Sequence, residues 1–401
     1  MEQSGVVHYL KLRTSYGAVG NASFPGDSYY PYFPSFTAGG TYNGSTYYFP
    51  EVPGNYNLSW EKSYPLNIGL DIGFINRIEI NLDYYNTRTK DLLFMNPLPS
   101  SQGYEFQWAN VGEIRNTGIE MAINAIAIKT NDFTWSLYLN IAANKNEMLA
   151  LSDKESVSEM VISRGNPTQI LTVGGGAFDW YMPKWLGVDP DNGQPLWEDI
   201  IYDDAGNEID RVATSNYNDA AEDYQIMGSP FPDFSGGFGT MLAYKGVSLN
   251  VAFAYSYGNK IYHTNRQELD NDGENISVNA MKLQDGWSRW VNPGDHTTHP
   301  ESVYGGNMNS NKYSSRYLED GSYLRIRNIT LAYDLPAIYA QRIKLQGLRL
   351  TFSIDNLVTW TNYSGLDPDV PLYLGAYNLP GTQYFKYPIS KQFLLGLEIS
   401  F

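Results

Sequence analysis

The sequence has no cysteine, which excludes a disulfide framework, thiolate metal ligands and thiol chemistry. No stretch approaches the 18 or so consecutive apolar residues that indicate a membrane-spanning helix. Only 17% of the residues are charged, and the net charge of −16 argues against nucleic acid as a partner. The N-terminus has no basic segment followed by an apolar core and a cleavage site, so no signal peptide is predicted.

Motifs for covalent or metal chemistry are also lacking. There is no G-x-S-x-G nucleophile motif. His296 and His299 are spaced as a pair but have no third ligand nearby, so a zinc site is not expected. The sequence therefore predicts no enzyme activity, no catalytic residue, no metal and no cofactor.

What the chain has in abundance is tyrosine, with 33 residues, and glycine, with 37. Its last segment, 390–401, alternates strictly between two kinds of side chain. One parity is wholly apolar and consists of Phe393, Leu395, Leu397, Ile399 and Phe401, and the other is small or polar apart from Leu394. Alternate side chains of a strand point to opposite faces, so this pattern predicts a strand between lipid and a wet lumen.

The same alternation recurs along the whole chain. The ten segments predicted as strands are 9–16, 65–74, 78–91, 112–126, 133–146, 234–244, 247–257, 322–335, 348–355 and 390–401. In the eighth of them the apolar parity changes near Arg327 and Asn328, which predicts a β-bulge.

The connections between these strands alternate between long and short. The long ones are 17–63, 92–111, 147–233, 259–321 and 358–389. Outer-membrane barrels have short periplasmic turns on one rim and long external loops on the other. The predicted fold class is therefore all-β, an antiparallel transmembrane β-barrel segment that occupies residues 1–401, with these five loops external.

Several stretches resemble the SusC/RagA-like group of TonB-dependent outer-membrane transporters of Bacteroidetes. Residues 110–120, NVGEIRNTGIE, are the most specific match. Residues 10–17, 60–62, 187–193, 323–333 and 350–361 follow the family in order, so that the resemblance covers nearly the full chain. It implies a plugged barrel of about 22 strands, of which this chain supplies roughly the last ten.

The resemblance also implies a function and partners. The family imports oligosaccharides, or sometimes peptides, across the outer membrane of Gram-negative bacteria. A SusD-like surface lipoprotein acts as a lid, and the TonB complex pulls on an N-terminal plug, which this chain lacks together with the early strands. Membrane lipid surrounds the barrel. Phe401 matches the C-terminal aromatic residue that the outer-membrane assembly machinery recognises, although an anchor at the lipid interface explains it equally well.

Aromatic residues in the long loops are the candidates for solute contact, because aromatic faces stack on sugars and partner proteins. The candidates are Trp180, Tyr181, Trp197 and Trp290. The alternative is that they pack the small cores of the loops themselves. Trp135 and Trp360, near strand ends, are interpreted as an interfacial belt.

Two acidic stretches, 189–193 and 270–274, have the clustered oxygens that Ca²⁺ prefers. Neither has a complete ligand set, and tight acidic turns are favoured for both.

Two other functions are consistent with parts of the pattern. A soluble glycan-binding or glycoside hydrolase β-domain would explain the Tyr and Trp content, but it would need a carboxylate pair and polar outer faces. A non-transporting barrel fragment is the third hypothesis.

Overall fold

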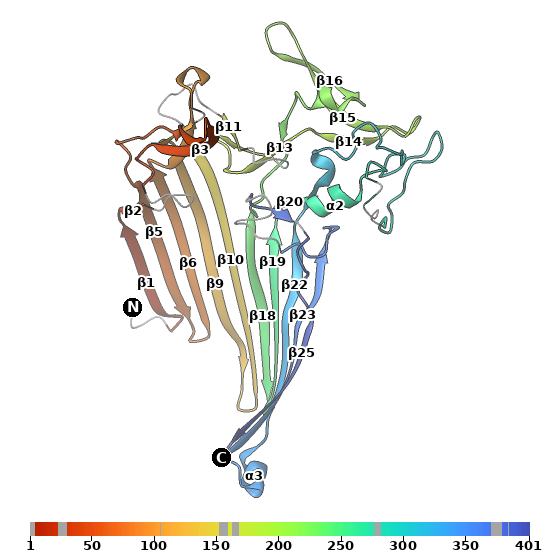
Figure 1. Cartoon of the computed structure of the whole chain (residues 1–401). Coiled ribbons are helices and arrows are strands. Elements are labelled where there is room, and N and C mark those ends of the chain that lie inside the picture. The colour runs from red at the N-terminus through yellow and green to blue at the C-terminus, as the bar shows by residue number, and fades with distance from the viewer. Residues whose placement is uncertain are drawn as a thin grey trace.

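The computed structural model describes residues 5–22, 30–104, 106–151, 159–162, 168–275, 277, 282–369, 379–383 and 385–401. Within these residues one large antiparallel sheet runs the length of the molecule (Figure 1). Its ten principal strands are β1 (Val7–Tyr16), β5 (Glu61–Phe74), β6 (Ile78–Lys90), β9 (Glu113–Lys129), β10 (Phe133–Ala150), β18 (Phe234–Tyr244), β19 (Val247–Tyr257), β22 (Tyr323–Asp334), β23 (Gly347–Thr361) and β25 (Gln392–Ser400). They are the ten predicted strands, and each pairs with its neighbours in sequence order.

The short turns place their residues in the left-handed region of the backbone, at a steric cost for the β-branched Ile75. Ile75 and Asn76 have φ values of 43° and 52° between β5 and β6. Lys245 and Gly246 have φ values of 45° and 89° between β18 and β19. Two-residue turns with both residues at positive φ match the twist of the flanking strands. The connection from β22 to β23 is longer and contains α3 (Ala337–Ala340) and η3 (Gln341–Ile343).

The predicted bulge is confirmed. Against β19, β22 has one additional residue, Arg327, between Ile326 and Asn328. The register with β23 also shifts there, and β23 has two residues, Asn356 and Leu357, between the partners of Ile326 and Asn328. The bulge restores the apolar parity on the later half of the strand.

The long connections have secondary structure of their own. The first contains β2 (Val19–Asn21), which pairs with β5, and the hairpin of β3 (Ser35–Tyr42) with β4 (Ser45–Val52). The second contains β7 (Leu93–Pro97), η1 (Ser100–Gln102) and β8 (Phe106–Asn110). The third contains β11 (Glu159–Ile162), β12 (Gln169–Thr172), β13 (Asp179–Met182), β14 (Trp185–Val188), β15 (Pro195–Tyr202), β16 (Glu208–Thr214), α1 (Tyr217–Ala220) and β17 (Gln225–Ile226). The last two contain β20 (Lys260–His263), α2 (Thr264–Leu269), η2 (Ser315–Tyr317), β21 (Leu318–Asp320) and β24 (Thr382–Gln383).

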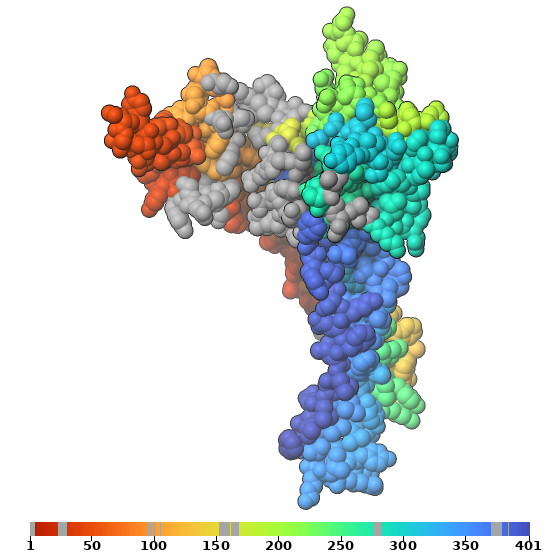
Figure 2. Space-filling model, turned by 45° about the vertical axis from the view of Figure 1, so that its right-hand side comes forward, coloured from red at the N-terminus to blue at the C-terminus, as the bar shows by residue number. Residues whose placement is uncertain are grey.

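These long connections gather at one end of the sheet, and the short turns lie at the other (Figure 1). We call the gathered connections the outer layer; Figure 2 shows it as a broad mass above the narrow stem of strands. The C-terminus lies at the opposite end, beside α3 (Figure 1). Among the residues that the structure describes, none of the helices combines the length and the apolar character needed to cross a bilayer.

The two faces of the sheet differ in chemistry. In an antiparallel pair, directly opposite residues share a face. One face carries rows of paired apolar residues, such as Leu70, Leu82, Met121 and Ile141 across β5, β6, β9 and β10. Large side chains on this face remain exposed, for example Phe352 at 41% and Leu395 at 84%. An apolar face open along every strand is what a lipid-facing wall requires.

Candidate functional site

The other face of the sheet is polar and carries a compact charge cluster near β1. The Nη2 atom of Arg13 lies 2.8 Å from an Asp71 oxygen and 2.9 Å from Asp83. Asn81 donates a 3.0 Å hydrogen bond to Asp71, which is buried. Because these residues come from β1, β5 and β6, the cluster ties three strands together on the inner face.

Trp180 lies in the main hydrophobic core of the outer layer. The core joins it to Met182, Tyr262, Tyr313 and Tyr317, all fully buried. The ring centroids of Trp180 and Tyr262 are 5.9 Å apart. The indole Nε1 donates to the carbonyl oxygen of Lys260 at 3.1 Å. The ring therefore joins β13 to β20, two segments from different long connections.

Tyr181 follows Trp180 on β13 and points to the opposite face of the strand. Its ring is only partly buried and meets the Tyr224 ring edge to face at 5.3 Å. Of the four predicted contact residues, it is the one with an accessible side chain.

Trp197 belongs to a second aromatic group, on β15. It is fully buried between the rings of Trp185 at 5.6 Å and Tyr217 at 5.3 Å, both edge to face. Burial raises the pKa of the Tyr217 phenol, with further contributions from Tyr224. This group packs the arm formed by β14, β15 and β16 against α1.

Trp290 packs on the acidic turn at residues 189–193. Its Nε1 donates to the carbonyl oxygen of Pro190 at 2.9 Å. Gly193 has a φ of 73°, and a Cβ there would lie 2.4 Å from the Trp290 ring. The structure thus distributes the four predicted residues over three sites; only Trp180 and Tyr181 lie together. Their contact with solute stays a prediction.

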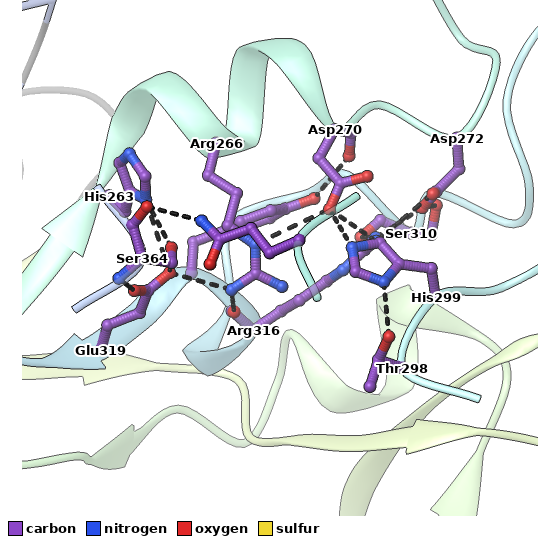
Figure 3. A network of polar contacts seen from close by, with 12 residues as sticks. His263, Arg266, Asp270, Asp272, Thr298, His299, Ser310, Arg316, Glu319 and Ser364 are labelled. Carbon is purple, nitrogen blue, oxygen red and sulfur yellow. Dashed lines mark hydrogen bonds and ion pairs between the residues drawn. The ribbon is translucent and has the colours of Figure 1, made fainter. Parts of the chain in front are cut away.

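A buried ionic network crosses the outer layer (Figure 3). It adjoins the aromatic core, because the Tyr317 hydroxyl donates a 3.3 Å hydrogen bond to the carbonyl oxygen of Asp270. Its centre is the pair Asp270 and Asp272, both almost fully buried. The Nη1 atoms of Arg316 and Arg289 lie 2.5 and 2.6 Å from Asp272 oxygens. The Nε2 atom of His299 lies 2.6 Å from Asp270. The positive charges surround both carboxylates, so the network fixes the 270–274 stretch in one position.

Glu319 forms the second end of the network (Figure 3). Its carboxylate lies 3.0 Å from Arg266 Nη1 and accepts a 2.6 Å hydrogen bond from the Ser364 hydroxyl. Burial works against ionisation, but the hydrogen bonds from His263 and Ser364 and the charge of Arg266 outweigh it. Together they lower the pKa of Glu319 to about 2. The carboxylate therefore stays charged at neutral pH and links β21 to residue 364.

The two acidic stretches both form turns. Asp189 accepts hydrogen bonds from the backbone N–H of Asp191 at 2.9 Å and from the Asn192 amide at 2.8 Å. Asp270 and Asp272 are bound by arginine and histidine as described above. Among the described residues there is no cluster of three or more His, Asp or Glu suited to a metal ion.

The ionic network was not predicted from the sequence. Its members are spread from residue 263 to residue 364, with no spacing that marks them as a unit. The one available signal was the acidic stretch 270–274, which we interpreted as a turn or a cation site. Buried carboxylates in an arginine-containing loop would have been the better hypothesis, since a charge is rarely buried without a partner.

Aromatic residues mark both ends of the apolar face. At the outer end, Trp360 pairs with Leu324 and lines a groove with Phe234, Tyr255 and Tyr257. The rings of Phe234 and Tyr257 are stacked at 5.0 Å. At the other end, Trp135 near the start of β10 donates a 2.8 Å hydrogen bond to Thr240. Amphipathic rings at both interfaces are typical of a membrane-spanning barrel wall.

Comparison with known families agrees with this architecture. Residues 5–357 match the family model described as TonB dependent receptor-like, beta-barrel. The chain is 32% identical to TonB-dependent receptor P3 of Formosa agariphila, with all of this chain and 40% of that protein covered. It is 31% identical to TonB-dependent receptor SusC of Bacteroides thetaiotaomicron, with all of this chain and 38% of SusC covered.

Solved structures show the same similarity. The chain superposes on the RagAB peptide transporter with a TM-score of 0.81 at 28% identity, covering 100% of this chain and 42% of that chain. The RagAB peptide importer in the open-open state gives a TM-score of 0.82 at 27% identity, with 100% and 41% covered. The chain therefore spans about 40% of the length of the curated relatives it matches.

Proposed function

Because the chain belongs to the TonB dependent receptor-like β-barrel family, we propose that it forms the C-terminal barrel wall and external loops of a solute importer. The predicted location in the outer membrane is confirmed by that membership. The named relatives are receptors and transporters, not enzymes.

The observation that carries the proposal is the two-faced sheet beneath a folded outer layer. The outward face is apolar and open along the strands. The inward face holds charge clusters such as Arg13 with Asp71 and Asp83. The outer layer is held in place by the aromatic core and the ionic network, so it presents a defined surface at the mouth of the barrel.

The proposed cargo is an oligosaccharide or a peptide. RagAB, to which the chain superposes, is described as a peptide transporter, and the aromatic content of the outer layer suits sugar stacking as well. Tyr181 is the favoured contact, because its ring is accessible while Trp180, Trp197 and Trp290 are held in packed cores.

The proposed mechanism involves no covalent chemistry. The outer layer and a SusD-like lipoprotein capture the solute, the TonB complex moves a plug in the N-terminal part of the receptor, and the solute passes along the polar face. The lipoprotein partner is what the resemblance to the SusC/RagA-like group implies, and the match to SusC supports it. Phe401, exposed at 83% at the rim opposite the outer layer, is the proposed assembly signal.

Growth experiments test the import proposal. A strain that lacks the intact receptor is supplied with single oligosaccharides or peptides as the only carbon source. We expect a growth defect on one of these classes, which the receptor gene repairs. In the repaired strain, short-term uptake of that solute should stop when a proton-gradient uncoupler is added. Growth equal to wild type on every solute of both classes would contradict import. A monodisperse protein in detergent-free buffer would contradict the membrane wall itself.

A further inference from the structure

The outward face of the sheet changes sharply from apolar to charged toward the outer layer. On β6 the outward residues run Ile80, Leu82, Tyr84, Asn86, Arg88 and Lys90. On β9 the row that starts with Met121 and Ile119 continues to Thr117 and Arg115. On β10 the same level is reached at Lys145 and Glu147. The change therefore occurs at one level on three neighbouring strands.

The height of this level matches a membrane interface. The part of β10 from Trp135 to Glu147 rises roughly 40 Å along the strand. A tilt of about 40° reduces that to roughly 30 Å along the membrane normal. The hydrocarbon core of a bilayer is also about 30 Å thick. Trp135 lies near the interface at the short-turn end of the sheet. The charged rows then lie at the opposite interface, among the lipid headgroups of the outer leaflet.

Positive charge is in excess at this level. Among the described residues, the cations at this level are Lys62, Arg88, Lys90, Arg115 and Lys145, and the carboxylates are Asp91, Glu113 and Glu147. Asp91 lies 2.7 Å from Lys62, which is directly opposite Lys90. Arg88 forms an ion pair with Glu113. Arg115 lies 2.7 Å from the Glu147 carboxylate, and Lys145 lies 3.9 Å from that carboxylate. Lys90 makes no ion pair in the described part of the chain. An excess of cations stands out in a chain whose net charge is −16.

The cations border a hollow at the upper end of the first three strands of the sheet. Tyr16, Tyr64, Leu66, Asn86, Arg88 and Lys90 line a depression of about 340 Å³. Because Tyr16 pairs with Leu66 and Leu66 with Asn86, these residues share the lipid-facing side. The hollow has an apolar floor below and cations above, which is the arrangement that a lipid headgroup with attached acyl chains requires.

We propose that this hollow binds the phosphate-bearing headgroup of a lipid in the outer leaflet, with Lys90 and Arg88 as the phosphate contacts. Arg115 and Lys145 extend the same surface along the headgroup plane. The acyl chains continue down the apolar rows toward Leu82 and Leu70. Two features indicate that the ligand is an anionic lipid. One is the excess of positive charge, and the other is the continuity of the hollow with the lipid-facing wall of the barrel.

Native mass spectrometry of the intact receptor that contains this chain tests the site. The probes are bis-phosphorylated lipid A, the same lipid A after removal of its phosphates, and inorganic phosphate. The variants are Lys90→Gln and Lys90→Gln with Arg88→Gln. Lys245→Gln is the matched control, since this lysine is 59% exposed and lies in a turn at the opposite rim. Heat-modifiable migration on gels confirms that each variant is folded.

We expect bound lipid A on the wild type and on Lys245→Gln, with affinity falling about fivefold for each cation removed, as about 1 kcal/mol per basic residue near a membrane surface predicts. Dephosphorylated lipid A should bind more weakly to the wild type and be unaffected by the substitutions. Equal binding of lipid A by the wild type and Lys90→Gln would overturn the proposal, and this single variant removes no ion pair. The proposal would also be overturned if the wild type bound dephosphorylated lipid A as tightly as bis-phosphorylated lipid A. Saturation of the hollow by inorganic phosphate alone would overturn it as well.

Discussion

The hydroxyl of Tyr85 donates a 2.9 Å hydrogen bond to the side-chain oxygen of Asn144, two strands away on the inner face. Gly118 lies between them, paired with Tyr85 on one side and with Asn144 on the other. A Cβ at position 118 would lie 2.4 Å from the Tyr85 ring. The ring therefore crosses β9 only because that residue is glycine, which explains one residue of the NVGEIRNTGIE stretch.

Gly118→Ala is expected to displace the Tyr85 ring, break its hydrogen bond to Asn144 and destabilise the folded barrel by about 1–3 kcal/mol. Urea unfolding of the intact receptor in detergent micelles measures the change. Gly396→Ala is the control, because it is also a strand glycine of the main sheet but its nearest neighbour to a new Cβ is Thr351 at 3.6 Å. If both variants unfold at the wild-type urea concentration, the crossing ring is not under the inferred constraint.

The apolar face gives a prediction from two adjacent residues of β23. Phe352 pairs with Leu331 and Leu395 on the outward face, whereas Thr351 pairs with Ala332 and Gly396 on the inward face. Phe352→Arg is expected to destabilise the folded barrel by up to about 2–4 kcal/mol, which is the destabilisation that arginine causes on the lipid face near the bilayer midplane. Thr351→Arg should cost much less, because its side chain enters the wet interior. The yield of folded receptor in outer-membrane fractions compares them, and equal yields would contradict the assignment of faces.

Much of the barrel wall could be predicted from the sequence, because a strand period of two is visible in one chain without knowledge of its partners. The bulge at Arg327 was visible for the same reason. The ends of the strands were harder to predict from the sequence. β10 continues to Ala150 and β5 begins at Glu61, beyond the predicted bounds, because polar outward residues at the rim interrupt the alternation.

The outer layer was far less predictable. Trp180 and Tyr262 come from different connections, and nothing local indicates that their rings meet at 5.9 Å. The pairing of Asp272 with Arg316 joins residues that are also distant in sequence. Such contacts depend on how loops fold over one another, so composition showed aromatic residues without showing which ones are buried.

Substitutions at Trp180 and at the adjacent Tyr181 should distinguish a packing role from a role in solute contact. Trp180→Ala leaves a cavity in the aromatic core and is expected to destabilise the outer layer by about 3–5 kcal/mol. Tyr181→Ala should leave the layer folded and reduce uptake of the transported solute. Limited proteolysis reports the fold, and uptake of labelled solute reports the contact. A Tyr181→Ala receptor with unchanged uptake would remove Tyr181 from the contact surface.

The acid sensitivity of the outer layer should depend on Glu319. Its pKa is lowered to about 2 from the ordinary value of 4.5 for a glutamate, so the folded state favours the charged form. The contribution to stability is then complete above pH 4.5 and is lost as the pH falls toward 2. The full contribution is on the order of 3 kcal/mol, from about 1.4 kcal/mol for each pKa unit. The wild-type layer should therefore loosen over this range.

Hydrogen exchange of peptides from residues 260–269 and 315–320, measured between pH 5 and pH 2 and corrected for intrinsic exchange rates, tests this dependence. Glu319→Gln should begin less protected, because it removes the charge that Arg266 faces at 3.0 Å, and should then change less with pH than the wild type. Asp270 also has a lowered pKa, since contacts from His299 and Arg316 outweigh its burial, so some pH dependence remains in the variant. The difference between the two proteins isolates Glu319. Parallel pH profiles would show that another carboxylate controls the layer.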